Sequence, residues 1–341
     1  MLPLKLLQQH DIDALVTQRS GEQKIAQSIT LASSTPALFE TNGQTDCRFA
    51  LIGVPEDIGP RANLGYSGAT GGWQAFLQYF LNLQANDYLP ATDILLVGEV
   101  DCTDLLANES DSTDTLREKC AQLDDRVHQV LVQLFAMGLV PIVIGGGHNN
   151  AFPIIKACSE VTTLPLAVAN LDPHSDFREL EGRHSGNPFR YAHEQGLISH
   201  YAVLGLHEQK NNSASLAALK ANDFPWYSIQ QTHWSNTHNY DQCLEQVAKY
   251  LLETGLPIGV EVDMDAISEM PSSAMTFAGL TLKDALYYVD QMASLPHSKY
   301  LHLAEAAPLR HAQGEKEGKR VVGQALAELV STFVKSFNRE D

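Results

Sequence analysis

The sequence predicts a single three-layer α/β/α domain with a mostly parallel central sheet, and three observations lead to this fold class. Short apolar segments alternate along the chain with longer amphipathic ones, which is the order of a repeated strand–helix unit. Most of the apolar segments are continuous runs bounded by Gly, Pro or Asp, as expected of parallel strands buried on both faces. No linker, internal repeat or low-complexity run divides the chain, so we expect one domain.

The individual elements follow from these patterns in chain order. Residues 1–45 are polar and weakly periodic, so we expect a peripheral segment there and the domain itself at residues 46–341. Strands are expected at residues 49–54, 94–100, 140–144, 166–171, 201–206, 258–264 and 300–304. Helices are expected at residues 73–83, 115–137, 242–252, 282–293 and 323–337. In the second of these helices, Val127, Val130 and Leu134 recur at the spacing of one helix face.

Composition and charge limit the function classes. The 341 residues are 44% hydrophobic and 19% charged, an ordinary globular composition with enough apolar material for a sizeable core. Lys and Arg number 23 against 41 Asp and Glu, which gives a formal charge of −18. Such a surface repels phosphate backbones, so we expect no nucleic-acid partner. A small anionic substrate stays open, because one buried Arg can dominate a pocket.

Cysteine usage and hydropathy point to a cytoplasmic protein. The five cysteines are scattered and form no CxxC pair, which excludes a disulfide scaffold and a thiolate zinc site of the usual spacing. No stretch approaches the roughly 18 apolar residues that a membrane-spanning helix needs. The N-terminus has no small-residue cleavage site, so we expect no export and no membrane partner.

Two expected strands end in polar clusters, at the place where α/β folds bind ligands. After residues 140–144 come three glycines and His148; glycines let the backbone turn tightly and approach a ligand closely. A phosphate-binding loop is the alternative, but the spacing is neither GxGxxG nor GK[ST]. After residues 166–171 come Asp172, His174 and Asp176, which point to one side if the segment is extended. Such a buried row needs a partner, and a metal ion is the natural one.

A third strand carries acids in alternation. In residues 258–264 and just beyond, Glu261, Asp263 and Asp265 are expected on one face, where they repel one another unless a cation lies between them. The three clusters together supply imidazole and carboxylate ligands without thiolate, a set that suits Mn²⁺, with Zn²⁺, Co²⁺ or Fe²⁺ as other possibilities. Because the carboxylates exceed what one ion needs and can bridge, we expect a two-metal site that ionises a water.

These motifs resemble the ureohydrolase superfamily, which includes arginase, agmatinase and formimidoylglutamase. The resemblance extends from about residue 50 to residue 308, with Gly147 in place of the usual Asp before the first histidine. It implies an arginase-like fold and two Mn²⁺ ions. One ion is expected on His148, Asp172, Asp176 and Asp263, and the other on Asp172, His174, Asp263 and Asp265.

Flanking residues are most similar to formimidoylglutamase. The similar features are the GGGH form of the first motif, Arg178 after the central motif, and the segments 53–57, 63–69 and 185–190. The resemblance implies hydrolysis of N-formimino-L-glutamate to L-glutamate and formamide, in histidine degradation. By the same resemblance Glu305 grips the amidine. Asp176 is a candidate relay for the proton of the attacking water. Arg178, Ser185 and Asn187 are expected to bind a substrate carboxylate.

Several features depart from the family pattern. Phe189 stands where arginases carry a histidine thought to shuttle protons, and His184 is a candidate replacement, with His193 or neither as alternatives. Asn149 and Asn150 replace a more usual Ser or Glu, and Glu261 replaces a frequent Ser.

Other functions stay open at this stage. Arg178 has an alternative role as a structural ion pair with Glu179 or Glu181. Alternative functions are a ureohydrolase that acts on arginine, agmatine or a guanidino acid and releases urea, a two-metal phosphoesterase, and a metal-binding pseudoenzyme. The resemblance suggests a trimer or hexamer.

Overall fold

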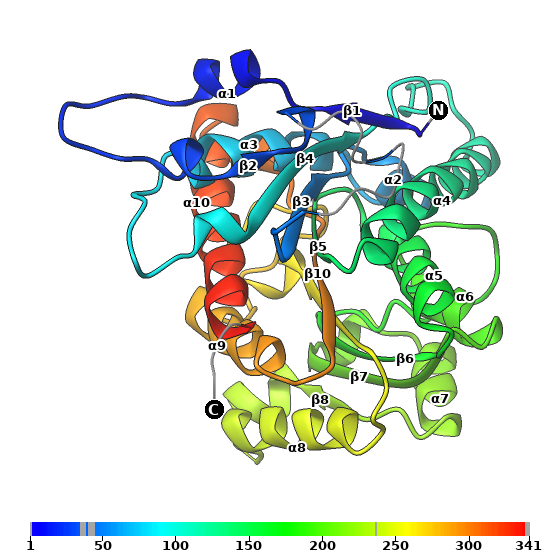
Figure 1. The fold of residues 1–341 in the computed structure, drawn as a ribbon. Helices are drawn as coiled ribbons and strands as arrows, with labels where there is room; N and C mark the ends of the chain where they lie inside the picture. Colours follow the sequence, from blue (N-terminus) through cyan, green and yellow to red (C-terminus); the bar gives the residue numbers. More distant parts are fainter. Residues whose placement is uncertain (1, 35–38, 40–44, 236, 338–341) are drawn as a thin grey trace.

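The computed structural model describes residues 2–34, 39, 45–235 and 237–337, which form one large sheet with helices on both faces (Figure 1). The 10 strands run in the order β1-β4-β3-β5-β10-β9-β6-β7-β8, and β2 also pairs with β4. Every pairing is parallel except that of β1 with β4. The predicted fold class, a three-layer α/β/α domain with a mostly parallel sheet, is confirmed.

The bounds of the elements are as follows. The strands are β1 (Leu4–Leu6), β2 (Thr30–Leu31), β3 (Phe49–Gly53), β4 (Ile94–Val100), β5 (Val140–Ile144), β6 (Leu166–Leu171), β7 (Ile198–Leu206), β8 (Trp226–Ser228), β9 (Ile258–Asp263) and β10 (Ser298–Ala304). The α-helices are α1 (Gln9–Leu15), α2 (Ile58–Ala62), α3 (Gly72–Phe80), α4 (Thr113–Ala136), α5 (Ala151–Thr162), α6 (Pro188–Glu194), α7 (Ser213–Ala221), α8 (Tyr240–Leu252), α9 (Leu282–Ala293) and α10 (Glu315–Phe337).

Two hydrophobic cores lie on the two faces of the sheet. Along β5, Ile142 and Ile144 belong to the core under α3, α8, α9 and α10, whereas Val143 belongs to the core under α4, α5, α6 and α7. This alternation follows from the period of two residues in a strand. Both faces of the central strands are therefore covered, which explains their continuous apolar sequences.

The sequence placed most elements correctly and some bounds wrongly. The strand predicted at 258–264 ends at Asp263, and Met264–Ala266 form a 3₁₀ turn, so the prediction that strand alternation orients Asp265 is wrong. Helix α10 begins at Glu315, before the predicted residue 323. The sequence did not indicate its first turns, because residues 315–320 are mostly charged and carry no apolar periodicity.

The N-terminal segment lies at one edge of the sheet (Figure 1). Strand β1 pairs antiparallel with β4, and β2 pairs parallel with it. Ile12 and Ile25 are nevertheless fully buried in the core on one face. The predicted division of the chain at residues 45 and 46 stays a prediction, and residues 35–38 and 40–44 lie outside the described part. Among the described helices, none has the length and apolar character to cross a membrane.

The middle of the sheet positions the polar clusters. Strands β5, β10, β9 and β6 are consecutive neighbours and all parallel. Their carboxyl ends therefore lie along the same edge of the sheet. The polar residues singled out in the sequence lie at the ends of these four strands and in the loops that follow them.

Candidate metal centre

The glycine run after β5 forms a turn that only glycine adopts easily. Gly145 and Gly146 have positive φ angles of 88° and 71°. A Cβ atom at Gly147 would lie 2.2 Å from Cδ of Pro60, too close for any side chain. This contact accounts for Gly147 where the family usually has Asp.

A buried glutamate that sequence reasoning missed holds this loop. Glu56 Oε1 accepts hydrogen bonds from Gly147 N and from Asn150 Nδ2, both at 2.7 Å, and from Asn149 Nδ2 at 3.3 Å. Its Oε2 accepts from Ile58 N at 2.6 Å. Asn149 and Asn150, which depart from the family pattern, are thus hydrogen-bonded to Glu56. Glu56 lies in segment 53–57, which the sequence had singled out without assigning this residue a role.

Four buried side chains converge at the end of β5, β6 and β9. Nδ1 of His148 lies 2.9 Å from Asp176 Oδ2, 3.1 Å from Asp172 Oδ2 and 3.4 Å from Asp263 Oδ2. One ligand atom from each of these residues lies within 4.8 Å of the others. The structure therefore brings together the four residues that the sequence grouped around one ion.

A second group shares Asp263 with the first. It consists of His174, Asp263 and Asp265, again with ligand atoms within 4.8 Å. Nδ1 of His174 lies 3.4 Å from Asp172 Oδ1 and 4.0 Å from Asp265 Oδ2. Asp263 is common to both groups, and Asp172 contacts the histidines of both, so these carboxylates are placed to bridge two ions. We call the six residues His148, Asp172, His174, Asp176, Asp263 and Asp265 the metal cluster.

Backbone N–H groups orient three of the carboxylates. Asp172 Oδ1 accepts from His174 N at 2.7 Å, Asp263 Oδ1 from Asp265 N at 2.7 Å, and Asp265 Oδ1 from Ala274 N at 2.9 Å. In Asp263 and Asp265 the other oxygen, Oδ2, faces a histidine of the cluster, whereas in Asp172 Oδ1 faces His174 and Oδ2 faces His148. These backbone contacts thus hold the three carboxylates in place within the cluster.

The cluster has the properties of a cation site. Burial raises the pKa of Asp263, and the charges of Asp265 and Asp172 raise it further. Burial and the charge of Asp172 likewise raise the pKa of Asp176 to about 6. Nδ1 of His148 makes no hydrogen bond although carboxylate oxygens surround it. Atoms that converge without hydrogen-bond geometry, in a buried set of carboxylates and imidazoles, fit a divalent ion such as Mn²⁺.

A cavity of about 510 Å³ opens beside the cluster. Asp176, Asp263 and Asp265 line it, and so does Glu305, which follows β10. Glu305 has a positive φ of 68°, and its Oε1 accepts from His148 N at 2.7 Å. Its Oε2 is buried without a hydrogen-bond partner. Glu305 therefore lines the cavity and has one carboxylate oxygen that no hydrogen bond within the described residues occupies.

The remaining predicted site residues divide into two groups. Arg178 and Ser185 line the cavity; Arg178 is 46% exposed and donates to Glu181 Oε1 through Nε and Nη2, at 3.1 and 2.7 Å. His184 and Asn187 are not among the lining residues. Both are buried, and their side chains hydrogen-bond one another and the 178–187 loop.

Lys210 is a lining residue that the sequence did not reveal. It lies in the 3₁₀ turn Glu208–Lys210 after β7, it is half-buried, and the described residues offer it no ion pair. It also lines the adjoining hollow with Tyr66 and Arg310. A basic residue in a loop of irregular sequence carries no periodic signal, so only the fold could place it here.

Comparison with known proteins agrees with this geometry. The sequence model of the Arginase family matches residues 47–331. The chain belongs to the arginase family. Among its relatives are the formimidoylglutamase of Chromobacterium violaceum, 32% identical over 170 residues, and that of Salmonella paratyphi A, 25% identical over 271 residues. The first match covers 48% of this chain and 50% of the relative, and the second 76% and 78%. The chain thus spans about half the length of the first relative.

Solved structures of the arginase family share the fold of this member. The formimidoylglutamase of Bacillus subtilis superimposes with a TM-score of 0.76 over 94% of this chain and 93% of its own, at 20% identity. A Trypanosoma cruzi formiminoglutamase solved with two Mn²⁺ ions gives a TM-score of 0.73 over 94% and 100%, also at 20% identity. The predicted family and the arginase-like fold are confirmed.

Proposed function

We propose that the chain is a formimidoylglutamase-like hydrolase that uses two Mn²⁺ ions to cleave the C–N bond of N-formimino-L-glutamate, which gives L-glutamate and formamide. The observation that carries this proposal is the pair of ligand groups that share Asp263 beside a cavity lined by Glu305. The names of the relatives support the substrate class.

The metal cluster would hold both ions. His148, Asp172, Asp176 and Asp263 would bind one, and His174, Asp263, Asp265 and Asp172 the other. Bound divalent ions would supply Lewis acidity, which lowers the pKa of a water molecule toward neutrality.

Glu305 and Asp176 handle the amidine. The free oxygen Oε2 of Glu305 accepts a hydrogen bond from the cationic amidine and orients its carbon toward the cluster. Asp176 also lines the cavity, so it can accept a proton from the attacking water and pass it to the departing nitrogen. His184 is turned into its own loop, and burial together with the charge of Arg178 lowers its pKa to about 4. We therefore assign no proton transfer to His184.

The substrate also carries two carboxylates, and the cavity offers two cations for them. Arg178 and Lys210 both line the cavity, with Ser185 beside Arg178. We propose that Arg178 exchanges Glu181 for a substrate carboxylate and that Lys210 binds the other. Asn187 acts indirectly, because its Nδ2 donates to the backbone of Glu179 and Gly182 and so holds the loop of Arg178 and Ser185.

The experiment is a product assay on manganese-loaded protein. N-formimino-L-glutamate, L-arginine, agmatine and guanidinobutyrate are supplied separately, and formamide and urea are measured. We expect formamide from the first compound and no urea from the others. Urea from any guanidine would keep the metal centre and overturn the substrate. No product from any compound, with two ions bound, would overturn the enzymatic function.

A further inference from the structure

Three polar side chains on neighbouring strands form a row across the sheet, two residues before Asp172 on β6 and Asp263 on β9. Glu261 on β9 is paired in register with Asn170 on β6 and with His302 on β10. All three side chains are fully buried. Buried polar groups in a strand core are costly unless they are satisfied, so this row calls for an explanation.

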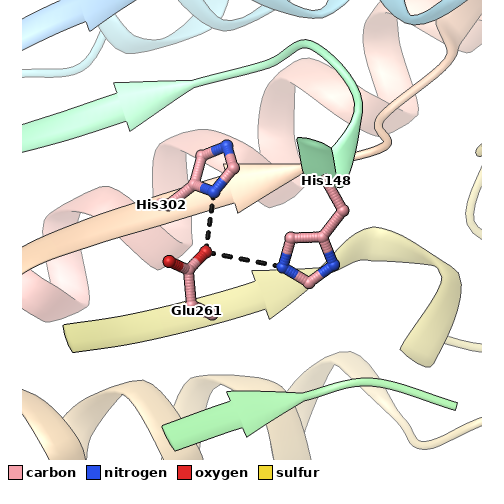
Figure 2. A group of neighbouring side chains, drawn as sticks. All are labelled: His148, Glu261 and His302. Carbon is pink, nitrogen blue, oxygen red and sulfur yellow. Dashed lines mark hydrogen bonds and ion pairs between the residues drawn. The ribbon is translucent and has the colours of Figure 1, made fainter. Parts of the chain in front are cut away.

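Glu261 is the centre of the row (Figure 2). Its Oε1 accepts from Tyr300 OH at 2.7 Å, and its Oε2 accepts from His302 Nδ1 at 2.7 Å. The same Oε2 lies 3.4 Å from Nε2 of His148, which is within ion-pair distance although the two atoms do not form a hydrogen bond. Figure 2 shows both imidazole rings next to this carboxylate, His302 from β10 and His148 from the segment after β5.

The two nitrogens of His148 therefore face different partners. Nδ1 faces Asp172, Asp176 and Asp263, while Nε2 faces Glu261. An imidazole that binds a metal through one nitrogen is usually oriented by a carboxylate or carbonyl at the other, which fixes the tautomer and raises the basicity of the ligand. Here the orienting carboxylate is itself held in place by His302 and Tyr300.

We propose that Glu261, clamped by His302, is a positioning residue that fixes the ring of His148 and strengthens selectively the metal subsite to which His148 belongs. This inference rests on the proposed binuclear centre. It concerns two residues that are not among the proposed metal ligands. Both are buried, and neither Glu261 nor His302 lines the substrate cavity. It also accounts for a glutamate where many family members have Ser, because the carboxylate reaches both imidazole rings.

The same three residues have the composition of a zinc site. His148, Glu261 and His302 offer ligand atoms within 4.8 Å of one another, and two histidines with a glutamate are a known zinc set. However, the His302 nitrogen and the Glu261 oxygen are at hydrogen-bond distance, and His148 Nδ1 faces the metal cluster. The geometry thus favours the hydrogen-bonded clamp over a third ion.

The test is calorimetric titration of Mn²⁺ into metal-free protein, with bound metal counted independently. Glu261→Gln removes the charge and keeps the shape. We expect two ions per chain in the unaltered protein, and in the variant one site weakened by about 10- to 100-fold and the other within about threefold. His302→Gln should weaken the same site by about tenfold, and it serves if Glu261→Gln does not fold.

Tyr288→Phe is the matched control. Tyr288 OH donates to the backbone oxygen of Glu261 at 3.2 Å, so this variant removes a buried hydrogen bond to the same residue and leaves the carboxylate untouched. Both sites should keep their affinity. Equal weakening of both sites, or no weakening, in the Glu261 and His302 variants would overturn the inference. The inference would also be overturned if the unaltered protein bound a third equivalent of Mn²⁺ and the His302→Gln variant did not. Failure of the unaltered protein to bind two ions would instead overturn the proposed function.

Discussion

The metal cluster and the rim of the cavity differ in how their geometry is determined. We call Arg178, Ser185 and Lys210 the rim. The carboxylates of the metal cluster lie at or just after the ends of adjacent parallel strands and are almost fully buried, and backbone N–H groups hold three of the four. Arg178 in the rim is 46% exposed and is paired with a neighbouring glutamate. The difference teaches that the geometry of the metal cluster is fixed by the sheet, whereas the proposed substrate-binding residues lie on loops, where Arg178 is paired with Glu181.

The largest effect is expected from removing the carboxylate that both metal groups share. Asp263→Ala should lower kcat by on the order of 10³-fold, because several kcal/mol of transition-state stabilisation depend on the bound ions. Activity and manganese content are measured on the same sample. Asp87→Ala, an exposed turn residue, is the control. Near-normal turnover in the Asp263 variant would show that the shared site is not the catalytic one.

The next largest effect concerns a buried ion pair behind the metal cluster. Arg183 Nε donates to Asp124 Oδ2 at 2.7 Å, and Arg183 Nη2 donates to the backbone oxygen of Asn149 at 2.8 Å. Asp124→Asn leaves the Arg183 charge unpaired and should reduce the free energy of unfolding by about 3 kcal/mol in chemical denaturation. Glu194→Gln breaks the more exposed pair with Arg190 and should cost at most about 1 kcal/mol. Equal losses of unfolding free energy in the two variants would contradict the expected difference between the buried and the more exposed ion pair.

Substitutions in the rim should change substrate binding, measured as KM, and leave kcat nearly unchanged. Lys210→Met is expected to raise KM for N-formimino-L-glutamate by about tenfold, with kcat within about threefold, because it removes a charge-assisted contact made equally in ground and transition states. Lys220→Met, on the exposed face of α7, is the control and should change neither constant. A fall in kcat alone would move Lys210 from substrate binding into the catalytic machinery.

The smallest expected effect is the number of protons that the metal cluster releases when manganese binds. Burial lowers the pKa of His174, but the hydrogen bond with Asp172 and the charges of Asp172, Asp265 and Asp176 together outweigh burial and raise the pKa to about 9. At pH 7.5 the metal-free His174 is therefore protonated, and manganese must displace at least this proton. Below about pH 6 Asp176 is protonated as well, so the affinity should fall more steeply with decreasing pH. Titrations in buffers of different ionisation enthalpy measure this release; identical heats in all buffers would contradict it.

The sequence revealed the metal cluster and not its surroundings, for physical reasons. Asp172, His174 and Asp263 stand at the ends of apolar runs, where strand order and charge repulsion leave few alternatives. Glu261, which the sequence grouped with the acids around the ions, accepts hydrogen bonds from His302 and Tyr300 of the neighbouring strand, and the sequence did not predict these contacts. That pairing depends on the register of β9 with β10, which no local pattern encodes.

Loop residues explain the other differences. Arg178 forms the ion pair that the sequence left as an alternative, and His184 and Asn187 hydrogen-bond within their loop. Their partners lie close in sequence, but the direction of each side chain depends on irregular backbone that periodicity does not describe. The predicted cytoplasmic location and the predicted trimer or hexamer stay predictions.

Anomalous diffraction at the manganese edge, from crystals grown with Mn²⁺, tests the central claim most directly. The account predicts two peaks per chain. One lies among His148, Asp172, Asp176 and Asp263, and the other among His174, Asp263 and Asp265, with Asp263 in contact with both. A single peak, or a peak between Glu261 and His302, would contradict it.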